Sequence, residues 1–155
     1  MKKIFFLPFI ATMLCLAQAS AQVYTTAMGL QSDFTNSYTL MIGPAIKHQF
    51  GKSSAIEGDM LFGRGGVTLQ GFYQVQEELV AKTGLQGYVG AGPSLSFYKG
   101  GTSFYLRPIA GLDYKINNVP LAVSFDWRPF IYLGNTYGSR FTGKSFGIGI
   151  KYAAK

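Results

Sequence analysis

Cysteine, histidine and charge are all scarce in this chain. Cysteine and histidine occur once each, at Cys15 and His48, so a disulfide framework and a cysteine-rich or histidine-rich metal site are excluded. Charged residues make up only 14% of the sequence, against about 25% in an average soluble domain. The basic residues form no run or stripe, which argues against nucleic acid as a partner.

Long apolar runs are also missing, except at the start of the chain. Two lysines precede the apolar stretch from Ile4 to Leu16, and the small residues Ala19 to Ala21 follow it. This order is typical of a cleaved export signal. A transmembrane helix is the alternative, but the stretch is interrupted by proline and falls short of the roughly 20 residues that a bilayer requires. We expect residues 1–21 to be a signal peptide and residues 22–155 to form one domain.

Beyond residue 21, apolar and polar residues alternate, as they do in β-strands. Turn-forming residues separate most of the alternating segments, as at Ser32-Asp33 with Asn36. The break from Gln76 to Thr83 is the one that carries helix-friendly acidic residues. The predicted strands are Val23–Gln31, Tyr38–Phe50, Ala55–Phe62, Val67–Val75, Leu85–Tyr98, Ser103–Ile116, Leu121–Leu133 and Ser145–Ala153. Connections this short suit hairpins and leave no room for a crossover helix. The sequence predicts an all-β fold of eight antiparallel, up-and-down strands.

Alternate side chains of a strand face opposite sides of a sheet, so odd and even positions can be sorted into two faces, and we call this sorting parity. In each predicted strand, parity separates an apolar face from a polar one. The apolar face carries Met28, Leu30, Leu40, Ile42, Ile46, Ile56, Met60, Leu69, Val89, Leu95, Leu106, Leu112, Val123, Phe125, Trp127, Ile148 and Ile150. The uncharged part of the polar face comprises Thr25, Gln31, Gln49, Thr68, Gln70, Gln74, Gln86, Ser94, Ser96 and Ser124. A transmembrane β-barrel has this pattern, with lipid outside and a polar lumen inside.

Most of the charges within the strands share the polar face. They are Lys47, Glu57, Asp59, Arg107, Asp113, Lys115, Asp126, Arg128 and Lys151. Acidic and basic residues are nearly balanced there, and buried charges are costly unless they are paired. We therefore expect a lumen ion-pair network in a barrel too narrow for a solute pore.

Aromatic residues fall near the strand ends. If the first strand starts in the periplasm, Tyr24, Phe50, Tyr73, Tyr114 and Tyr152 form one girdle on the apolar face, and Tyr38, Phe62, Phe97, Phe104 and Phe146 form the other. Membrane interfaces favour such girdles, whereas a soluble core would place aromatics in the middle of its strands.

The last strand carries a spaced pattern of polar, glycine, hydrophobic and aromatic residues: Ser145, Gly147, Ile150 and Tyr152. This pattern resembles the C-terminal insertion signal of outer-membrane barrel proteins. The resemblance implies recognition by the barrel assembly machinery, although three further residues follow Tyr152 here.

The whole chain after the signal peptide resembles the small eight-stranded outer-membrane barrels of the OmpA and OmpX type. The segment from Gly111 to Lys115, with Asn118, Pro120 and the run Asp126 to Pro129, is similar to small barrel proteins of Bacteroidota. The resemblance implies a monomer in the outer membrane, with outer-membrane lipids and lipopolysaccharide as neighbours. It carries over no catalytic residue, and a shared fold does not give function.

Catalytic and metal-binding constellations are not predicted. His48 falls on the apolar face with no serine placed to form a nucleophile and base pair, which disfavours a serine hydrolase. Glu57 and Asp59 share a face and could hold calcium, but pairing with basic lumen residues is the favoured interpretation. No cofactor is expected.

In-strand prolines fit the barrel least well, since each removes a ladder hydrogen bond. Pro44, Pro93, Pro108 and Pro129 all fall on the apolar face by parity. Bulges at these prolines could shift the facing of later residues. With Gly43, Gly90, Gly92 and Gly111 on the lumen side, they could instead mark room for an acyl chain or a bent wall.

These observations support a non-enzymatic outer-membrane barrel with a structural, surface-interaction or envelope-integrity role. The alternative is a lipid-binding or lipid-modifying barrel, such as an acyltransferase or deacylase, suggested by the glycines and prolines of the wall. A soluble lipocalin-like barrel would need an apolar lumen and a charged exterior, and parity indicates the reverse.

Overall fold

In the computed structural model, the described residues are 24–35, 39–51, 53–63, 65–134 and 141–154. The predicted signal peptide and Tyr38 lie outside them. The strands are β1 (Thr26–Thr35), β2 (Thr39–Phe50), β3 (Ser54–Gly63), β4 (Gly66–Val80), β5 (Leu85–Tyr98), β6 (Gly101–Lys115), β7 (Leu121–Trp127), β8 (Phe130–Tyr132), β9 (Phe141–Thr142) and β10 (Ser145–Ala154). In these residues, no helix has the length and hydropathy needed to span a membrane.

The strands close into an antiparallel barrel, which confirms the predicted all-β, eight-stranded, up-and-down fold. Each strand from β1 to β6 pairs with the next one along the chain, β6 pairs with β7 and β8, and β10 pairs with both β7 and β1. β7 and β8 run along β6 in one continuous register, so together they count as a single wall strand. Among the residues that the structure describes, closure leaves no long unpaired edge in the wall.

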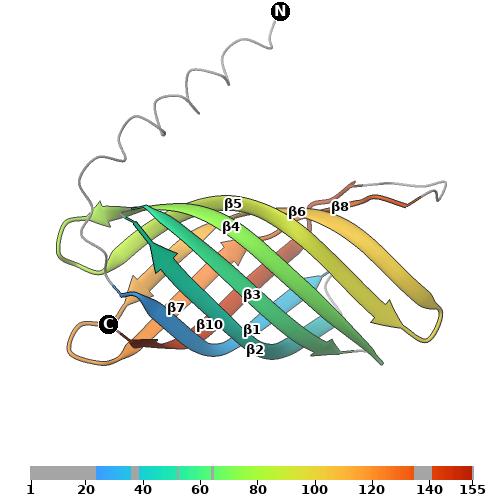
Figure 1. Ribbon diagram of the computed structural model, residues 1–155, viewed down its shortest axis with the longest axis horizontal. Helices are drawn as coiled ribbons and strands as arrows, with labels where there is room; N and C mark the ends of the chain where they lie inside the picture. The colour runs from blue at the N-terminus through green and yellow to red at the C-terminus, as the bar shows by residue number, and fades with distance from the viewer. Residues whose placement is uncertain (1–23, 36–38, 52, 64, 135–140, 155) are drawn as a thin grey trace, which may run out of the picture.

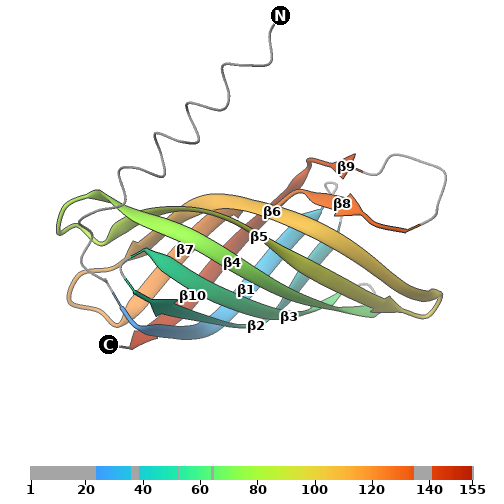
Figure 2. The same ribbon diagram turned by 45° about the horizontal axis from the view of Figure 1, so that its top comes forward.

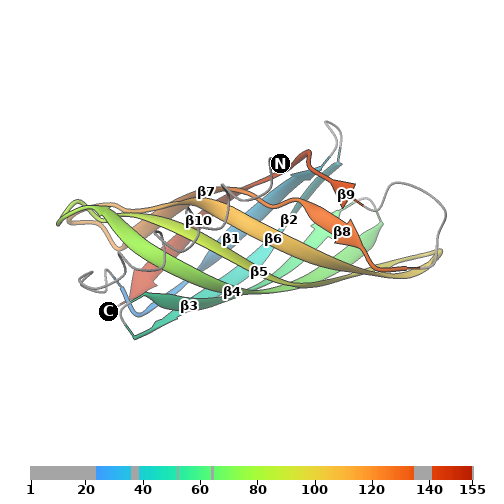
Figure 3. The ribbon, with the colours of Figure 1, turned by 90° about the horizontal axis from the view of Figure 1, so that it is seen from above.

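The two ends of the barrel differ in what they carry (Figure 1). β1 begins where β10 ends, with Thr26 opposite Ala154, and the β4–β5 hairpin lies at the same end. We call this the terminal end. The opposite end, called the far end, carries the β5–β6 hairpin and the short β8–β9 arm, which leans away from the barrel axis in Figure 2. The strands are tilted and coiled around the axis, as Figure 3 shows from above.

Two of the predicted breaks begin too early, because β1 and β4 extend into them; Asn36 of the first break lies outside the described residues. Ser32 and Asp33 belong to β1: the Ser32 hydroxyl donates to the Ile148 carbonyl at 2.8 Å, and Asp33 is buried in the lumen. The predicted break from Gln76 to Thr83 is shorter than expected, since β4 continues to Val80 and the turn occupies 81–84.

The wall contains a ladder defect where two prolines meet. The register pairs Ala110 with Trp127 and Leu106 with Ile131, which puts Pro108 directly opposite Pro129. Neither residue has an N–H group to donate, so the wall strand is interrupted between β7 and β8. Pro44, Pro93 and Pro108 face outward as predicted. Pro129 is buried at the break, between Arg128 and Phe130, which both lie on the lumen side.

The defect does not reverse the facing of the neighbouring side chains. Arg128 is fully buried in the lumen, and Phe130 beyond the proline lies against the lumen residues Tyr105 and Arg107. Bulge-induced switching of the faces, left open by the sequence, is therefore absent at this position.

The outward and inward faces separate by chemistry along the whole wall. Large apolar side chains such as Leu30, Ile46, Ile56, Val89 and Ile150 are about half exposed on the outside. The inside holds the charged and amide side chains, most of them almost fully buried. The barrel is thus apolar outside and polar inside.

Candidate functional site

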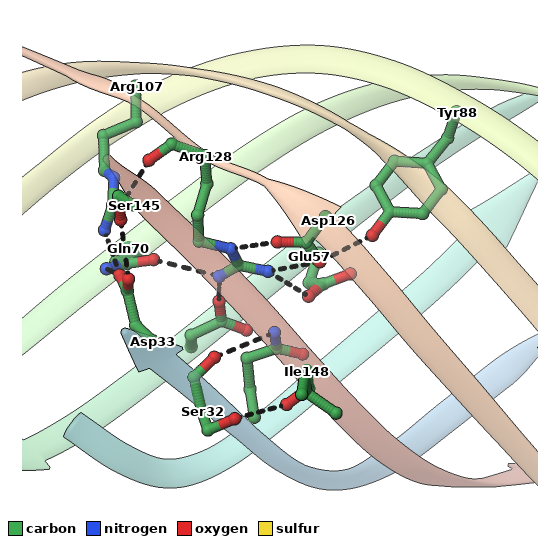
Figure 4. Close-up of polar contacts among 12 residues, drawn as sticks. Ser32, Asp33, Glu57, Gln70, Tyr88, Arg107, Asp126, Arg128, Ser145 and Ile148 are labelled. Atoms are coloured by element: carbon green, nitrogen blue, oxygen red, sulfur yellow. Dashed lines mark hydrogen bonds and ion pairs between the residues drawn. The ribbon is translucent and has the colours of Figure 1, made fainter. Parts of the chain in front are cut away.

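The middle of the lumen is organised around the guanidinium of Arg128, which projects from the end of β7 (Figure 4). It donates through Nε and Nη2 to Asp126, with 2.8 Å between Nη2 and Oδ2. Nη1 donates to Asp59 Oδ2 at 2.9 Å and to Gln70 Oε1 at 3.3 Å. The ring of Phe72 lies 5.3 Å from the guanidinium carbon. A planar group with several donors suits this multiple pairing better than an ammonium would.

Glu57 links Arg128 to β10. Its Oε1 lies 3.0 Å from Lys151 Nζ and 3.9 Å from Arg128 Nη2, and its Oε2 accepts a hydrogen bond from Gln74 at 3.1 Å. Lys151 also donates to Gln31 Oε1 at 3.2 Å. We call Arg128, Asp126, Asp59, Glu57 and Lys151 the Arg128 cluster. It joins β3, β7 and β10 across the lumen, so it braces opposite walls.

A second ion pair fills the lumen toward the terminal end. Lys47 Nζ donates to Asp113 Oδ2 at 2.8 Å, and the hydroxyl of Tyr24 donates to the same carboxylate oxygen. Lys47 Nζ also lies 4.5 Å from the centroid of the Tyr88 ring, and the Tyr88 hydroxyl donates to Asp126 Oδ2 at 2.7 Å. Tyr88 therefore connects this pair to the Arg128 cluster.

A third ion pair lies toward the far end and spans the proline defect. Arg107 Nη1 contacts Asp33 Oδ2 at 2.5 Å, while Nη2 donates to the Arg128 carbonyl at 2.6 Å and to Ser145 Oγ at 2.8 Å. The Arg128 carbonyl precedes Pro129 at the break. Arg107 thus supplies, from inside the lumen, a donor to the broken section of the ladder.

Eight of the nine charged residues predicted for the lumen lie in these three groups. Lys115 does not, and its placement in the network is wrong: it ends β6, is half-buried, and donates to the carbonyls of Ile116 and Val119 at 3.0 and 2.7 Å. Asp33 takes part instead, which sequence reasoning missed. Its shared parity with Gln31 was the available signal, and the reading of Ser32-Asp33 as a turn obscured it.

The exchange of Lys115 for Asp33 changes the charge of the lumen. The buried network contains five carboxylates, Asp33, Glu57, Asp59, Asp113 and Asp126, and four basic groups, Lys47, Arg107, Arg128 and Lys151. With every group ionised, the network has one negative charge more than it has positive charges. Every one of these carboxylates contacts a basic group in the network.

Tyr24 is the one described girdle residue that is placed wrongly. It is only 1% exposed and closes the terminal end of the lumen beside Ala27, Ala122 and Ala153. The chain bends at Thr25, before β1 begins, so the two-residue alternation does not extend to Tyr24.

The other described girdle residues face outward. Phe50, Phe62, Tyr73, Phe97, Phe104, Tyr114, Phe146 and Tyr152 are each at least 41% exposed. Phe50 and Tyr73 contact each other with ring centroids 6.2 Å apart. Tyr38 lies outside the described residues.

The residues of the predicted insertion signal divide between the two faces of β10. Ile150 and Tyr152 face outward, and Ser145 is buried and donates to Asp33 Oδ1 at 2.8 Å. Gly147 lies under the Arg128 cluster: a Cβ there would be 2.6 Å from Arg128 Nε and 2.7 Å from Gln31 Nε2. Glycine at this position therefore has a packing reason of its own, since it leaves space for the guanidinium.

Comparison with known proteins adds no family to this geometry. The sequence matches no protein-family model. It matches no curated protein either. What the lumen can do therefore follows from its own residues.

The wall glycines have a packing reason within the wall itself. At Gly43, Gly90, Gly92 and Gly111, an added Cβ would overlap backbone atoms of the neighbouring strand. These glycines allow adjacent strands to approach closely where the wall bends. The close approach supports the bent wall as the reason for these glycines.

Hydrolytic and metal chemistry find little support in the described part of the chain. His48 faces outward, and its Nδ1 lies 2.9 Å from Thr26 Oγ1, far from the lumen carboxylates. Glu57 and Asp59 are engaged by Lys151 and Arg128. No group of three or more histidine, cysteine or acidic side chains in these residues is arranged to hold a metal ion.

The lumen is filled in its middle and hollow at the far end. A cavity of about 140 Å³ lies above the Arg107 ion pair, and we call it the far-end cavity. Its floor contains the buried residues Asp33, Gln70, Ser94 and Arg107. Its upper wall contains half-buried residues, Thr35, Thr39, Met41, Ser96, Tyr105 and Phe130. The cavity is thus a dead end, since the Arg128 cluster closes the lumen beneath it.

Proposed function

We propose that the protein is a non-enzymatic outer-membrane β-barrel with a structural, surface-interaction or envelope-integrity role. The observation that supports this most is the distribution of charge and apolar surface. Ion pairs occupy the lumen, while leucine, isoleucine, valine and aromatic side chains cover the outside. In water, an outer surface of this kind would be an extensive exposed apolar patch, whereas in a bilayer it would contact the apolar acyl chains of the lipids.

The proposed role requires no passage of solutes. Arg128, Asp126 and Asp59 have side chains that are 0% exposed and cross the middle of the lumen. An eight-stranded barrel leaves an interior that side chains can fill. We expect the protein in planar bilayers to give no steady conductance, and a stable open channel would contradict the closed-lumen reading.

The proposed orientation places the terminal end in the periplasm and the far end at the cell surface, with residues 1–21 acting as the export signal. The partners in this proposal are outer-membrane lipids and lipopolysaccharide, together with the barrel assembly machinery during insertion. The protein would function as a monomer, because the closed wall leaves no long strand edge among the described residues to pair with another chain.

Single-cysteine labelling tests both location and orientation. Cys15 is the only cysteine in the sequence and lies within the proposed signal, so an introduced cysteine would be unique after cleavage. Lys99 and Lys82 are exposed turn residues at the far end and the terminal end, and they form a matched pair for substitution. We expect Lys99→Cys to react with a membrane-impermeant maleimide in intact cells, and Lys82→Cys to react only after the outer membrane is permeabilised.

The opposite labelling pattern would invert the orientation and leave the location intact. Labelling of both variants only after permeabilisation, with the protein in the soluble periplasmic fraction and without a heat-dependent shift in gel mobility, would refute the membrane proposal. Loss of barrier function on deletion, measured as sensitivity to bile salts and large antibiotics, tests the envelope-integrity role.

A further inference from the structure

We propose that the far-end cavity is a binding site for one sugar ring of a neutral saccharide. This goes beyond the structural role, and it does not depend on membrane location because binding can be measured on the purified barrel. The inference starts from the position of the cavity, at the mouth of the lumen, with a buried polar floor and half-buried walls.

The size of the cavity limits the ligand to a single ring. Its volume is about 140 Å³, close to the roughly 150 Å³ of a protein cavity that holds one benzene ring. A cavity of this size admits one six-membered ring. A longer oligosaccharide would have to project out of the mouth, since the Arg128 cluster closes the lumen below.

The charge of the floor excludes most ionic ligands. Among the described residues that line the cavity, Arg107 alone is basic, and Asp33 neutralises it at 2.5 Å. A phosphate or carboxylate ligand would therefore be repelled by Asp33, because Arg107 is already paired. A cationic ligand would be repelled by Arg107. The Asp33 carboxylate is further engaged by Ser145 at 2.8 Å and Gln70 at 3.3 Å. A neutral ligand with both donors and acceptors is the class that fits.

The walls combine aromatic and hydroxyl groups on different sides. Tyr105 and Phe130 form a T-shaped pair with ring centroids 5.1 Å apart on the β6–β8 side. Hydroxyls of Thr68 and Ser96, 2.8 Å from each other, stand on β4 and β5. A sugar ring presents C–H groups on one face and hydroxyls around its edge, so it can pack on the aromatic pair while its edge hydroxyls exchange hydrogen bonds with Thr68 and Ser96 on the adjoining strands.

The floor also holds an unsatisfied donor. Arg107 Nε is buried and has no hydrogen-bond partner in the described part of the chain. Buried polar groups without partners are uncommon in native structures and call for a bound molecule or water. An acceptor oxygen brought to the floor by a ligand, with a small shift of the Phe130 ring, would satisfy it.

Saturation-transfer NMR on the refolded barrel tests the proposal. The micelles should be dodecylphosphocholine, because glucoside and maltoside detergents would compete. The probes are methyl β-D-glucopyranoside, methyl β-D-galactopyranoside and N-acetyl-D-glucosamine in solution, and lipopolysaccharide in a separate sample. Free sugars binding alone would indicate a soluble saccharide, and lipopolysaccharide binding alone would indicate a membrane glycolipid; either supports the site. We expect at least one probe to bind with a Kd of about 1 mM.

Variants on β5 assign the signal to the cavity. Ser96→Phe should abolish binding by filling the cavity, and Ser96→Ala should retain most of it. Leu95→Phe adds the same ring one residue away on the outer face, and it should bind as the unchanged protein does. Tyr105→Leu should weaken binding about tenfold, the factor that 1.4 kcal/mol represents. Absence of transfer to every probe, or equal transfer in Ser96→Phe and Leu95→Phe, would overturn the proposal.

Discussion

Replacing Arg128 with Met should destabilise the barrel by about 3 to 5 kcal/mol, because it removes one partner from a buried ion cluster and leaves the others uncompensated. The Arg128 side chain is 0% exposed and contacts Asp126, Asp59 and, more distantly, Glu57. Asp126 would retain the Tyr88 hydroxyl at 2.7 Å, and Glu57 would retain Lys151 at 3.0 Å. Asp59 would lose its hydrogen bond, and its Oδ1 already has no partner in the described residues. The excess negative charge of the lumen would also grow by one.

Urea unfolding of protein refolded in detergent micelles measures this cost. With a slope of about 2 kcal/mol per M, the expected loss lowers the unfolding midpoint by roughly 1.5 to 2.5 M. The slope should stay unchanged, since the same surface is exposed on unfolding. Heat-dependent gel mobility at matched urea concentrations gives an independent measure of the folded fraction.

Two comparison variants separate the ion cluster from a general effect of removing charge. Lys99→Met removes a basic residue from an exposed turn and should change stability by only about 0 to 1 kcal/mol. Arg128→Met combined with Asp59→Asn removes the carboxylate that is left unpaired, and it should recover part of the loss. A loss below about 1 kcal/mol for Arg128→Met, or no recovery in the double variant, would refute the buried-network interpretation.

Further predictions concern the residues around this cluster. Gly147→Ala should destabilise the barrel by about 1 to 3 kcal/mol, because the added Cβ would overlap with Arg128 Nε. An unchanged urea midpoint would show that the cluster can accommodate the extra methyl group, contrary to this expectation. Lys47→Met should cost about 3 to 5 kcal/mol and Lys115→Met about 0 to 1 kcal/mol in the same assay, since the first is paired in the lumen and the second caps a turn; equal losses would contradict this division. Asp33→Asn should lower the midpoint and increase proteolysis near the β8–β9 arm, because Arg107 loses the anion that holds it over the defect; mass spectrometry of early fragments checks the position.

Parity within a strand predicted most of the lumen correctly, because alternate side chains of a paired strand must face opposite sides. Lys47 and Asp113 illustrate this: they stand on β2 and β6, far apart in sequence, and meet at 2.8 Å. Parity gave the facing of each residue and carried no information on its height along the barrel axis. For that reason it placed Lys115 in the lumen, although its strand ends at that residue.

Local sequence signals failed where a distant partner outweighed them. Ser32 and Asp33 are turn formers by composition, but contacts with Ile148 and Arg107 hold them in β1. Tyr24 has an aromatic side chain near a strand end, as an interface residue would, but a bend at Thr25 turns it inward onto Asp113. Such contacts join residues more than 60 positions apart, so no window of local sequence contains them.

The pairing of Pro108 with Pro129 bears on the order in which the barrel can form. The gap they leave is bridged by Arg107, which is held in place by Asp33 of β1 and Ser145 of β10. Those two strands meet only at the seam between the two ends of the chain, with Thr35 opposite Ser145. In an open sheet, Arg107 would lack the contacts with Asp33 and Ser145 that hold it against the interrupted ladder between β6 and β8. Both contacts are in place together only when β1 pairs with β10. Pairing of β1 with β10 and anchoring of Arg107 across the proline defect therefore occur together. This coupling disfavours partly assembled sheets and favours folding in a single concerted step.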